Sequence, residues 1–569
     1  MNFSKSVACV LICLVSASVH AQSFPPKKYP QHYFEWPVVI ATKGIVANFG
    51  ELRPNHYHMG LDCRTDQKQN LQVVASADGY IAKVKIEPFG FGRAIYINHP
   101  NGLTTLYAHL NNFNPALEKY VTEQQYRLKS WKVFLDIPAD LFPVKKGDFI
   151  AYSGSTGGSQ GPHVHFEIRD TRSDKVLNPS LFGFPLPDNV APDILKLAMY
   201  DRCTSTYEQT AKMFAVKKVK GVYSISPNSI VTNTDRVSFG IAAFDRYNAS
   251  NNRNGIYEAV IYDNETPVSG FQIDSISYDE TRYLNAHIDY KLRSSGGPFI
   301  EHLSRLPGYT KGIYKDFASD GVISLEDDSV HNIKIVVKDA YENTSVLEFK
   351  VSRSPAFVAK PKENNAPFAR SFAPGFINLF ENSNISFYLP ENALYDSIHF
   401  QYKETPVPGG YTIFQLHNTS VPVHSYFTVK IKATSPLPDK MVLHRFYNNK
   451  DDYAKATEKN GWYEGASRDF GNFQLMIDTI PPTITPVGFK DGMNAAKLTA
   501  LKFVVLDNTE EIENFTATLD GNWLRFTNDK GRTFVYIFDD KCQPGEHELK
   551  ITATDQVGNI MEKVYHFTR

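Results

Sequence analysis

Two histidines stand one residue apart, directly after a glycine-rich loop, in the segment SGSTGGSQGPHVHFEIRD at residues 153–170. Polar and apolar side chains alternate from His163 to Ile168, which is typical of a β-strand. Residues two apart in a strand point to the same face, about 6.5 Å apart. We therefore expect His163 and His165 to face one point, as a metal site, a proton-transfer site or both. The alternative is an incidental pair on a solvated strand.

A second group of polar residues lies in NHYHMGLDCRT, residues 55–65, where His58 and Asp62 are four apart. Gly60 and the flanking sequence favour a strand and a loop over a helix, so the fold has to bring this pair together. A third piece, GLTTLYAHL at residues 102–110, alternates in the same way and predicts that His109 shares a strand face with Tyr107.

The three segments together offer several imidazoles and one carboxylate. Two imidazoles and a carboxylate form a three-ligand Zn²⁺ site with an open fourth position, which is the arrangement of catalytic sites. A histidine beside such a site can take or give a proton, because its ordinary pKa of about 6.5 lies near working pH. The residues alone leave open which of His163 and His165 is the ligand.

Length and composition describe a large globular protein. The chain has 569 residues, of which 42% are hydrophobic, enough for roughly four domains of about 150 residues each. Its 60 basic and 61 acidic side chains balance, so nothing in the charge indicates binding to nucleic acid.

The N-terminus, MNFSKSVACVLICLVSASVHAQ, has the basic, apolar and small-residue parts of a signal peptide. We expect residues 1–21 to be removed, because the apolar run is too short to anchor the chain comfortably in a bilayer. The remaining sequence contains no other apolar run that could cross a bilayer, so the mature protein is expected in the periplasm or outside the cell. Three cysteines then remain, too few for a disulfide framework, and Cys63 is expected to be a buried apolar residue.

The organisation is mainly β. Short β-like runs that end at Gly, Pro or Asn predict an antiparallel N-terminal domain. The tail contains a repeat, HNIKIVVKDAYEN from His331 and HELKITATDQVGN from His547, whose histidines are expected to be strand-end residues rather than ligands. We predict an antiparallel β domain at 22–188, immunoglobulin-like β-sandwiches at 189–353 and 480–569, and a β-rich, sandwich-like unit at 354–479.

An insertion at residues 112–143 interrupts the N-terminal domain. Its first part, PALEKYVTEQQYRLKSWKV, lacks glycine and predicts a helix. The expected apolar face consists of Leu117, Tyr120, Val121, Leu128 and Trp131. Such a face must be buried, either by a helix that supports the domain edge or by a lid that narrows the site.

The motifs HMGLD, YAHL, VKKGDFIAYSGSTG and GPHVHFE occur in the order and setting of the lysostaphin/LytM-type zinc endopeptidases, which residues 38–179 resemble. The resemblance implies a small antiparallel β fold with a metal in a groove, and cleavage of peptide bonds in peptidoglycan stem peptides or cross-bridges. It also implies that one Zn²⁺ is held by His58, Asp62 and His165, and that His109 and His163 are catalytic.

The function expected from these observations is that of an exported zinc metalloendopeptidase acting on peptidoglycan. One alternative is a zinc peptidase that acts on proteins, with the β tail as substrate receptor. Another is a non-catalytic, cell-wall-binding regulator on the same scaffold, which the presence of all five polar residues disfavours. The tail at 190–569, whose binding partner the sequence does not identify, is expected to position the enzyme and to supply no catalytic group.

Overall fold

The structure, a computed structural model, describes residues 24–25, 28–248, 250–354, 368–408 and 411–569. The expected signal peptide lies outside these ranges. Within them strands far outnumber helices, as the sequence predicts, and the helices are short. No helix in these ranges is long and apolar enough to cross a membrane.

The N-terminal unit is built on an antiparallel sheet with β13, His163–Asp170, near its centre. A smaller sheet and a hairpin of β2 and β3 complete it. The large sheet runs β1 (Ile45–Ala47), β4 (Leu61–Arg64), β13, β8 (Leu103–Ala108), β7 (Arg93–Asn98), β6 (Gly79–Ile86) and β10 (Val133–Asp136), with β11 (Pro143–Val144) beside β6. The others are β5 (Gln72–Val74), β12 (Phe149–Ser153), β9 (Leu110–Phe113), β2 (Leu52–Arg53) and β3 (His56–Tyr57).

Strand β13 separates the core from the face that carries the histidines. Val164, Phe166 and Ile168 are fully buried in a core that includes residues of both sheets. His163 and His165 alternate with them and therefore lie on the opposite face, as predicted.

The predicted helix of the insertion is α1, Pro115–Leu128. Leu117 enters the core together with Trp131, whereas Leu128 is 49% exposed, contrary to the expected face. The chain leaves the helix just after Leu128, and Trp131 covers the core there instead. Gln125 is buried on the same side and donates a hydrogen bond to the Trp131 carbonyl (2.6 Å).

The first tail unit is a single sheet path that folds into two layers. Phe239 of β18 and Phe349 of β26 meet with ring centroids 5.0 Å apart although their strands are not neighbours in the sheet, so the layers pack face to face. The path runs β22 (Glu301–His302), β18 (Arg236–Phe244), β15 (Asp193–Asp201), β16 (Lys212–Val219), β17 (Val222–Thr232), β26 (Thr344–Arg353), β25 (His331–Lys338), β19 (Glu258–Asp263), β20 (Thr266–Gln272) and β23 (Tyr314–Asp316). Beside it lie β24 (Ile323–Ser324) and the short helices α2 (Leu284–His287) and α3 (Tyr290–Ser294).

The middle and last units each contain two main sheets. The immunoglobulin-like character of the first and last units stays a prediction.

The first sheet of the middle unit consists of β28 (Asn378–Glu381), β29 (Ile385–Leu389), β33 (Pro422–Lys432), β37 (Trp462–Asp469) and β36 (Thr457–Lys459). Its second sheet consists of β31 (Tyr402–Val407), β32 (Tyr411–Leu416), β38 (Gly471–Ile477), β34 (Met441–Tyr447) and β35 (Lys450–Lys455). In addition, β27 (Arg370–Phe372) pairs with β30 (Ile398–Phe400). The last unit has β39 (Thr483–Pro486), β41 (Ala500–Leu506) and β44 (Thr533–Ile537), and β40 (Met493–Asn494), β46 (Ile560–Thr568), β45 (Glu546–Asp555), β42 (Ile512–Leu519) and β43 (Asn522–Trp523).

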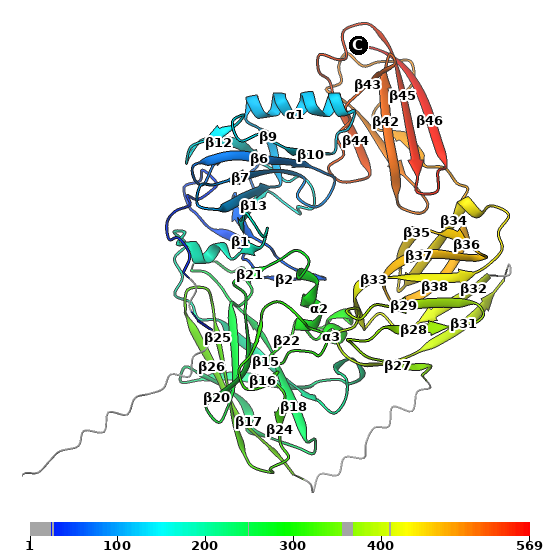
Figure 1. Cartoon of the computed structure of the whole chain (residues 1–569). Helices are drawn as coiled ribbons and strands as arrows, with labels where there is room; N and C mark the ends of the chain where they lie inside the picture. The colour runs from blue at the N-terminus through cyan, green and yellow to red at the C-terminus, as the bar shows by residue number, and fades with distance from the viewer. Residues whose placement is uncertain (1–23, 26–27, 249, 355–367, 409–410) are drawn as a thin grey trace, which may run out of the picture.

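The units follow one another around a ring, so that the last sandwich returns to α1 of the first unit (Figure 1). At this closure the Tyr126 hydroxyl donates to Asp539 (3.2 Å), and the Tyr126 ring lies 5.3 Å from that of Trp523. At the other junction β14 (Val176–Leu177) pairs with β21 (Ser275–Ile276), which belongs to the first tail unit. The N-terminal unit therefore contacts the tail on two sides.

Candidate metal centre

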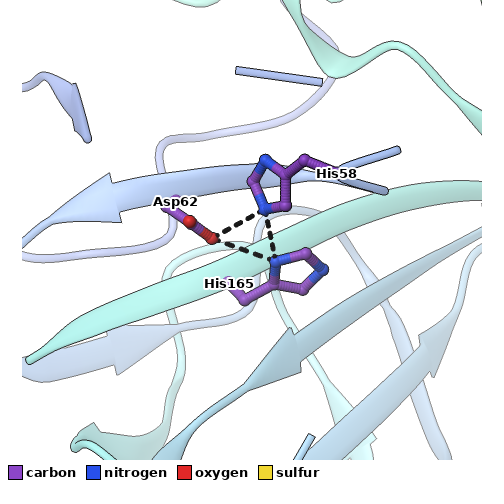
Figure 2. A group of neighbouring side chains, drawn as sticks. All are labelled: His58, Asp62 and His165. Carbon is purple, nitrogen blue, oxygen red and sulfur yellow. Dashed lines mark hydrogen bonds and ion pairs between the residues drawn. The ribbon is translucent and has the colours of Figure 1, made fainter. Parts of the chain in front are cut away.

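Three side chains converge on the face of the central sheet that lies opposite its core (Figure 2). The register of β13 and β4 places His165 opposite Asp62, and the turn before β4 brings in His58. His58 Nε2 lies 2.9 Å from Asp62 Oδ1 and 3.0 Å from His165 Nδ1, and the latter two atoms are 3.0 Å apart. The structure thus brings together the three residues that the sequence nominated as metal ligands.

Gly60 makes this close packing sterically feasible. A Cβ on Gly60 would lie 2.5 Å from the Phe166 carbonyl oxygen and 2.9 Å from the His165 ring. Any side chain would therefore push the turn away from β13, and His58 with it.

The hydrogen-bond partners of the two imidazoles fix where their protons are. His58 Nδ1 donates to the carbonyl oxygen of Asn48 (2.7 Å), and His165 Nε2 donates to Glu167 Oε1 (2.9 Å). Each neutral ring then keeps an electron pair on its other nitrogen, and that nitrogen faces the cluster. When both rings are neutral, two nitrogen electron pairs and a carboxylate oxygen face one point, where a cation could take the place of a proton.

The donor set fits Zn²⁺, which prefers imidazole nitrogen and carboxylate oxygen and is bound by three protein ligands in catalytic sites. All three side chains are buried. Burial alone would raise the pKa of Asp62, but His58, His163 and His165 hold it well below its usual range. Burial lowers the pKa of His165, yet hydrogen bonds to Asp62 and Glu167 raise it to about 9, so a proton competes with a metal for this ring.

A set of supporting residues, which the sequence reasoning did not single out, holds these ligands. Glu167 is fully buried; burial would raise its pKa, but Arg169, His165 and Tyr278 lower it to about 2. Its Oε2 accepts from Arg169 Nε (2.7 Å), and its Oε1 accepts from the hydroxyl of Tyr278 (2.5 Å). The signal for Glu167 was its place two residues after His165 on the same strand face, and no sequence signal pointed to Tyr278.

Tyr278 belongs to the tail, and it touches the support of a candidate ligand rather than the cluster itself. No tail residue joins the His58–Asp62–His165 group within the described ranges. The sequence analysis expected the tail to position the enzyme and to supply no catalytic group, and it did not foresee the contact of Tyr278 with Glu167. On the opposite side Arg53 donates to Asp62 Oδ2 (2.8 Å), which leaves Oδ1 turned toward the two imidazoles.

The two further histidines lie beside the cluster. His163 Nε2 is 3.4 Å from Asp62 Oδ1, and the His163 ring is centred 4.8 Å from the ring of His109. Both rings donate from Nδ1 to a backbone carbonyl, His163 to Gly161 (2.8 Å) and His109 to Thr156 (2.9 Å). Burial and the neighbouring histidines lower the pKa of His109 to about 3, so this ring is neutral near pH 7.

His109 reaches the site in a way that strand alternation does not predict. Strand β8 ends at Ala108, and His109 adopts a left-handed backbone conformation with φ 60°. Tyr107 is fully buried in the core, so the expectation that His109 and Tyr107 share a strand face was wrong. Continued alternation would have put His109 into the core with Tyr107, and the left-handed turn directs its ring to the site instead.

The residues that the sequence analysis set aside lie outside the cluster. His56 is exposed and contacts the Pro54 carbonyl oxygen, and Cys63 is a fully buried free thiol in the core, as predicted. The repeat histidines His331 and His547 begin or nearly begin their strands, and each bonds an aspartate at an equivalent place. They are strand-end residues, as expected.

Three converging donors with two histidines beside them are the kinds of groups that a metal-dependent hydrolase uses, and similarity to known proteins narrows the class further. Residues 56–126 match peptidase family M23, and residues 371–478 match the Zu5-like domain. The N-terminal unit is therefore an M23 peptidase domain, which confirms the resemblance noted in the sequence. The matched range includes His58, Asp62 and His109 and ends before His163 and His165.

Three similar proteins illustrate the relationship. Over 136 residues the chain is 34% identical to the DD-carboxypeptidase/endopeptidase Mpg of Neisseria meningitidis serogroup B, covering 24% of this chain and 25% of the relative. Over 136 residues it is 32% identical to an uncharacterized metalloprotease of Haemophilus influenzae, covering 24% and 22%. The catalytic domain of lysostaphin from Staphylococcus simulans is 24% identical over 24% of this chain and 88% of that domain, with a TM-score of 0.18. The chain thus spans about a quarter of the length of the curated relatives it matches.

Proposed function

We propose that the chain is an exported zinc metalloendopeptidase that hydrolyses peptide bonds in peptidoglycan stem peptides or cross-links. The observation that carries this proposal is the convergence of three electron-pair donors, on His58, Asp62 and His165, beside two further histidines. The M23 match supports peptide-bond hydrolysis, and a relative named DD-carboxypeptidase/endopeptidase supports a peptide substrate of this kind.

His58 Nε2, Asp62 Oδ1 and His165 Nδ1 would hold the metal. When bound, Zn²⁺ lowers the pKa of a water molecule and polarises a carbonyl group. Glu167 keeps the His165 ring in one orientation by accepting its other proton, and Arg53 occupies the second oxygen of Asp62. These contacts leave one electron pair of each ligand directed at the same point.

His109 and His163 would move protons. Because each ring donates from Nδ1 to a backbone carbonyl, each keeps an electron pair on Nε2. As a water oxygen attacks the scissile carbonyl carbon, one imidazole takes the proton of the water. The carbon–nitrogen bond then breaks, and the proton passes to the leaving amine.

Digestion of purified sacculi tests the proposal. The whole chain, reconstituted with Zn²⁺, should convert cross-linked muropeptides into uncross-linked ones, as seen by chromatography and mass spectrometry. Activity should vanish on chelation, return with added Zn²⁺, and be strongly reduced in His109→Ala. Unchanged sacculi together with cleavage of an unfolded protein would instead indicate a peptidase acting on proteins, and no cleavage of either would indicate a regulator.

Export rests on the signal-like sequence at residues 1–21. Fractionation of cells that produce the chain tests it, since an exported protein leaves the cytoplasm and loses these residues. A full-length chain retained in the cytoplasm would contradict export.

A further inference from the structure

Two other groups of side chains converge outside the candidate metal centre, and both consist of aspartates. In the first tail unit each member contributes one oxygen, and these oxygens lie within 4.8 Å of one another. The last unit holds a second group with the same property. The groups are Asp188, Asp245 and Asp339, and Asp478, Asp507 and Asp555.

The two groups occupy equivalent places in the two units. One aspartate lies in the segment before the first strand, one at the end of an inner strand, and one where the penultimate strand turns into the last. In the first unit these places adjoin β15, β18 and β25, and in the last unit β39, β41 and β45. The same three carboxylates have therefore been kept together in two separate sandwiches.

Each group contains buried carboxylate oxygens that lack a partner. Asp245 is only 2% exposed and its Oδ1 accepts no hydrogen bond from any described residue; Asp478 is 3% exposed and its Oδ2 accepts none. The equivalent residues repeat this atom for atom, because Oδ2 of Asp188 and Oδ1 of Asp507 are also buried without a partner. A buried carboxylate oxygen without a partner is costly, so its recurrence at matching atoms indicates a missing positive ligand.

Electrostatics gives the same indication. Among the ion pairs of the described residues, which include that of Arg246 with Asp193, none involves any of the six aspartates. Burial, Asp339 and Asp188 raise the pKa of Asp245 to about 8, and burial raises that of Asp188 to about 6. The groups are thus short of positive charge.

Neighbouring asparagines hold the groups in place. Asn343 Nδ2 donates to Asp339 Oδ2 (2.7 Å), and Asn559 Nδ2 donates to Asp555 Oδ2 (2.7 Å). Asn559 Nδ2 also lies 3.1 Å from the Asp478 carbonyl oxygen, which ties the segment before β39 to the turn of the sandwich. Oxygens fixed by the surrounding chain bind a cation without first having to be ordered.

We propose that each group binds one Ca²⁺. The donors are all oxygen, which suits Ca²⁺, whereas Zn²⁺ favours nitrogen and sulfur as at the candidate metal centre. Ca²⁺ takes six to eight oxygens in flexible geometry, so three carboxylates with backbone carbonyls and water form a suitable shell. Mg²⁺ demands near-ideal octahedral geometry and retains its water, and it should bind more weakly.

The location gives the ions a structural consequence. Asp188 lies in the segment that leads from the peptidase unit into β15, and Asp478 lies in the segment that leads from the middle unit into β39. The other aspartates of each group belong to the sandwich that follows. A Ca²⁺ ion at each place would therefore fasten one unit to the next and limit the angle between them.

Calorimetric titration of the zinc-loaded whole chain with CaCl₂ tests this, together with thermal unfolding with and without CaCl₂. The variants are Asp245→Asn, Asp507→Asn and the double substitution, all close in shape to the original side chain. Asp136→Asn, at an exposed residue of β10, is the matched control. Circular dichroism and unfolding of the double variant in chelator establish that it is folded.

The expected result is two Ca²⁺ per chain for the original protein and the control, one for each single variant, and none for the double variant. CaCl₂ should raise the unfolding midpoint of the original protein and leave the double variant unchanged. Absence of binding to the original protein, or retention of two ions by the double variant, would overturn the proposal. Equal affinity for Mg²⁺ would overturn the assignment to Ca²⁺. Loss of both ions in one single variant would overturn the claim that the two groups bind their ions independently.

Discussion

Every imidazole around the candidate metal centre has one nitrogen committed to an oxygen of the protein. For His58, His109 and His163 this oxygen is a backbone carbonyl, and for His165 it is a carboxylate. These contacts hold the four rings in one orientation before any metal or substrate arrives. The remaining nitrogens supply electron pairs for a cation and for protons.

Removal of either histidine outside the ligand set should separate binding from chemistry. In His163→Ala and in His109→Ala we expect the zinc content to be kept and the hydrolysis of peptidoglycan to fall by about 10²–10⁴-fold. Zinc analysis and a rate assay on the same samples measure both. His56→Ala, which alters an exposed histidine nearby, should leave both unchanged. Loss of zinc in His163→Ala would show that this ring is a ligand.

The carboxylate behind His165 should control metal affinity. Glu167→Gln keeps the size of the side chain but removes the charge that orients His165, and we expect zinc affinity to fall by about 10–100-fold. Competition with a chromogenic chelator measures this. Tyr278→Phe removes only one neutral donor to Glu167 and should have a smaller effect. Equal zinc affinity in Glu167→Gln and the original protein would refute the role of Glu167.

Sequence reasoning found the groups that could do chemistry but not the way one of them is placed. His58, Asp62, His163 and His165 lie where their motifs predicted, because strand alternation and register bring them together. The placement of His109 depends on a left-handed backbone conformation that alternation cannot signal. Tyr278 stands 111 residues from Glu167, so its contact could be known only from the fold.

At the level of elements, α1 is a connecting support rather than a cover. Its inner side enters the peptidase core through Leu117, and its outer side contacts the last sandwich through Tyr126. Gln125 also accepts from Arg525 of that sandwich (2.9 Å). A helix held on both sides favours the supporting role over a lid that opens and closes.

Two leucines of α1 provide a matched test of this role. Leu117→Ala should lower the free energy of unfolding by about 2–5 kcal/mol, because it leaves a cavity in the core. Leu128→Ala alters a half-exposed side chain and should change the free energy by about 0.5 kcal/mol or less. Denaturant unfolding of the whole chain compares them. A larger loss for Leu128→Ala would show that the helix packs by a different face.

The strands themselves were largely predictable. Turn residues and the alternation of polar and apolar side chains predicted the antiparallel N-terminal unit. The repeated sequence that forms β25 in one unit and β45 in another was also visible. The helix at 115–128 was predicted from its periodicity, whereas the exposure of Leu128 was not, because it depends on where the chain turns after the helix. The aspartates that converge in two sandwiches were visible only as turn residues until the fold joined three segments.

At the scale of the whole molecule, the last sandwich reaches the loop that precedes β13. Lys530 Nζ donates to three backbone carbonyls of this loop, Ser155 (3.0 Å), Gly157 (2.7 Å) and Ser159 (2.9 Å). The carbonyl of Thr156, between the first two, holds His109. The C-terminal unit thus steadies the backbone that orients a proposed catalytic ring, and the linear sequence gives no indication of this closure.

Loss of this contact should therefore reach the site. In Lys530→Met the loop should exchange its amide hydrogens faster, and kcat/KM should fall by about 10–100-fold, since small displacements of a catalytic group are costly. Hydrogen exchange and a rate assay measure the two effects. Lys550→Met, which removes an ion pair with Glu562 on the same unit, should alter neither. Unchanged exchange and unchanged or faster hydrolysis would contradict a supporting role.

The central claim is that His58, Asp62 and His165 hold a metal ion. Zinc analysis of the whole chain, after equilibration with Zn²⁺ and exhaustive dialysis in the presence of CaCl₂, tests it most directly. We predict one zinc ion per chain for the original protein and for His163→Ala, and a nearly complete loss for His165→Ala. A full zinc complement in folded His165→Ala would contradict the account.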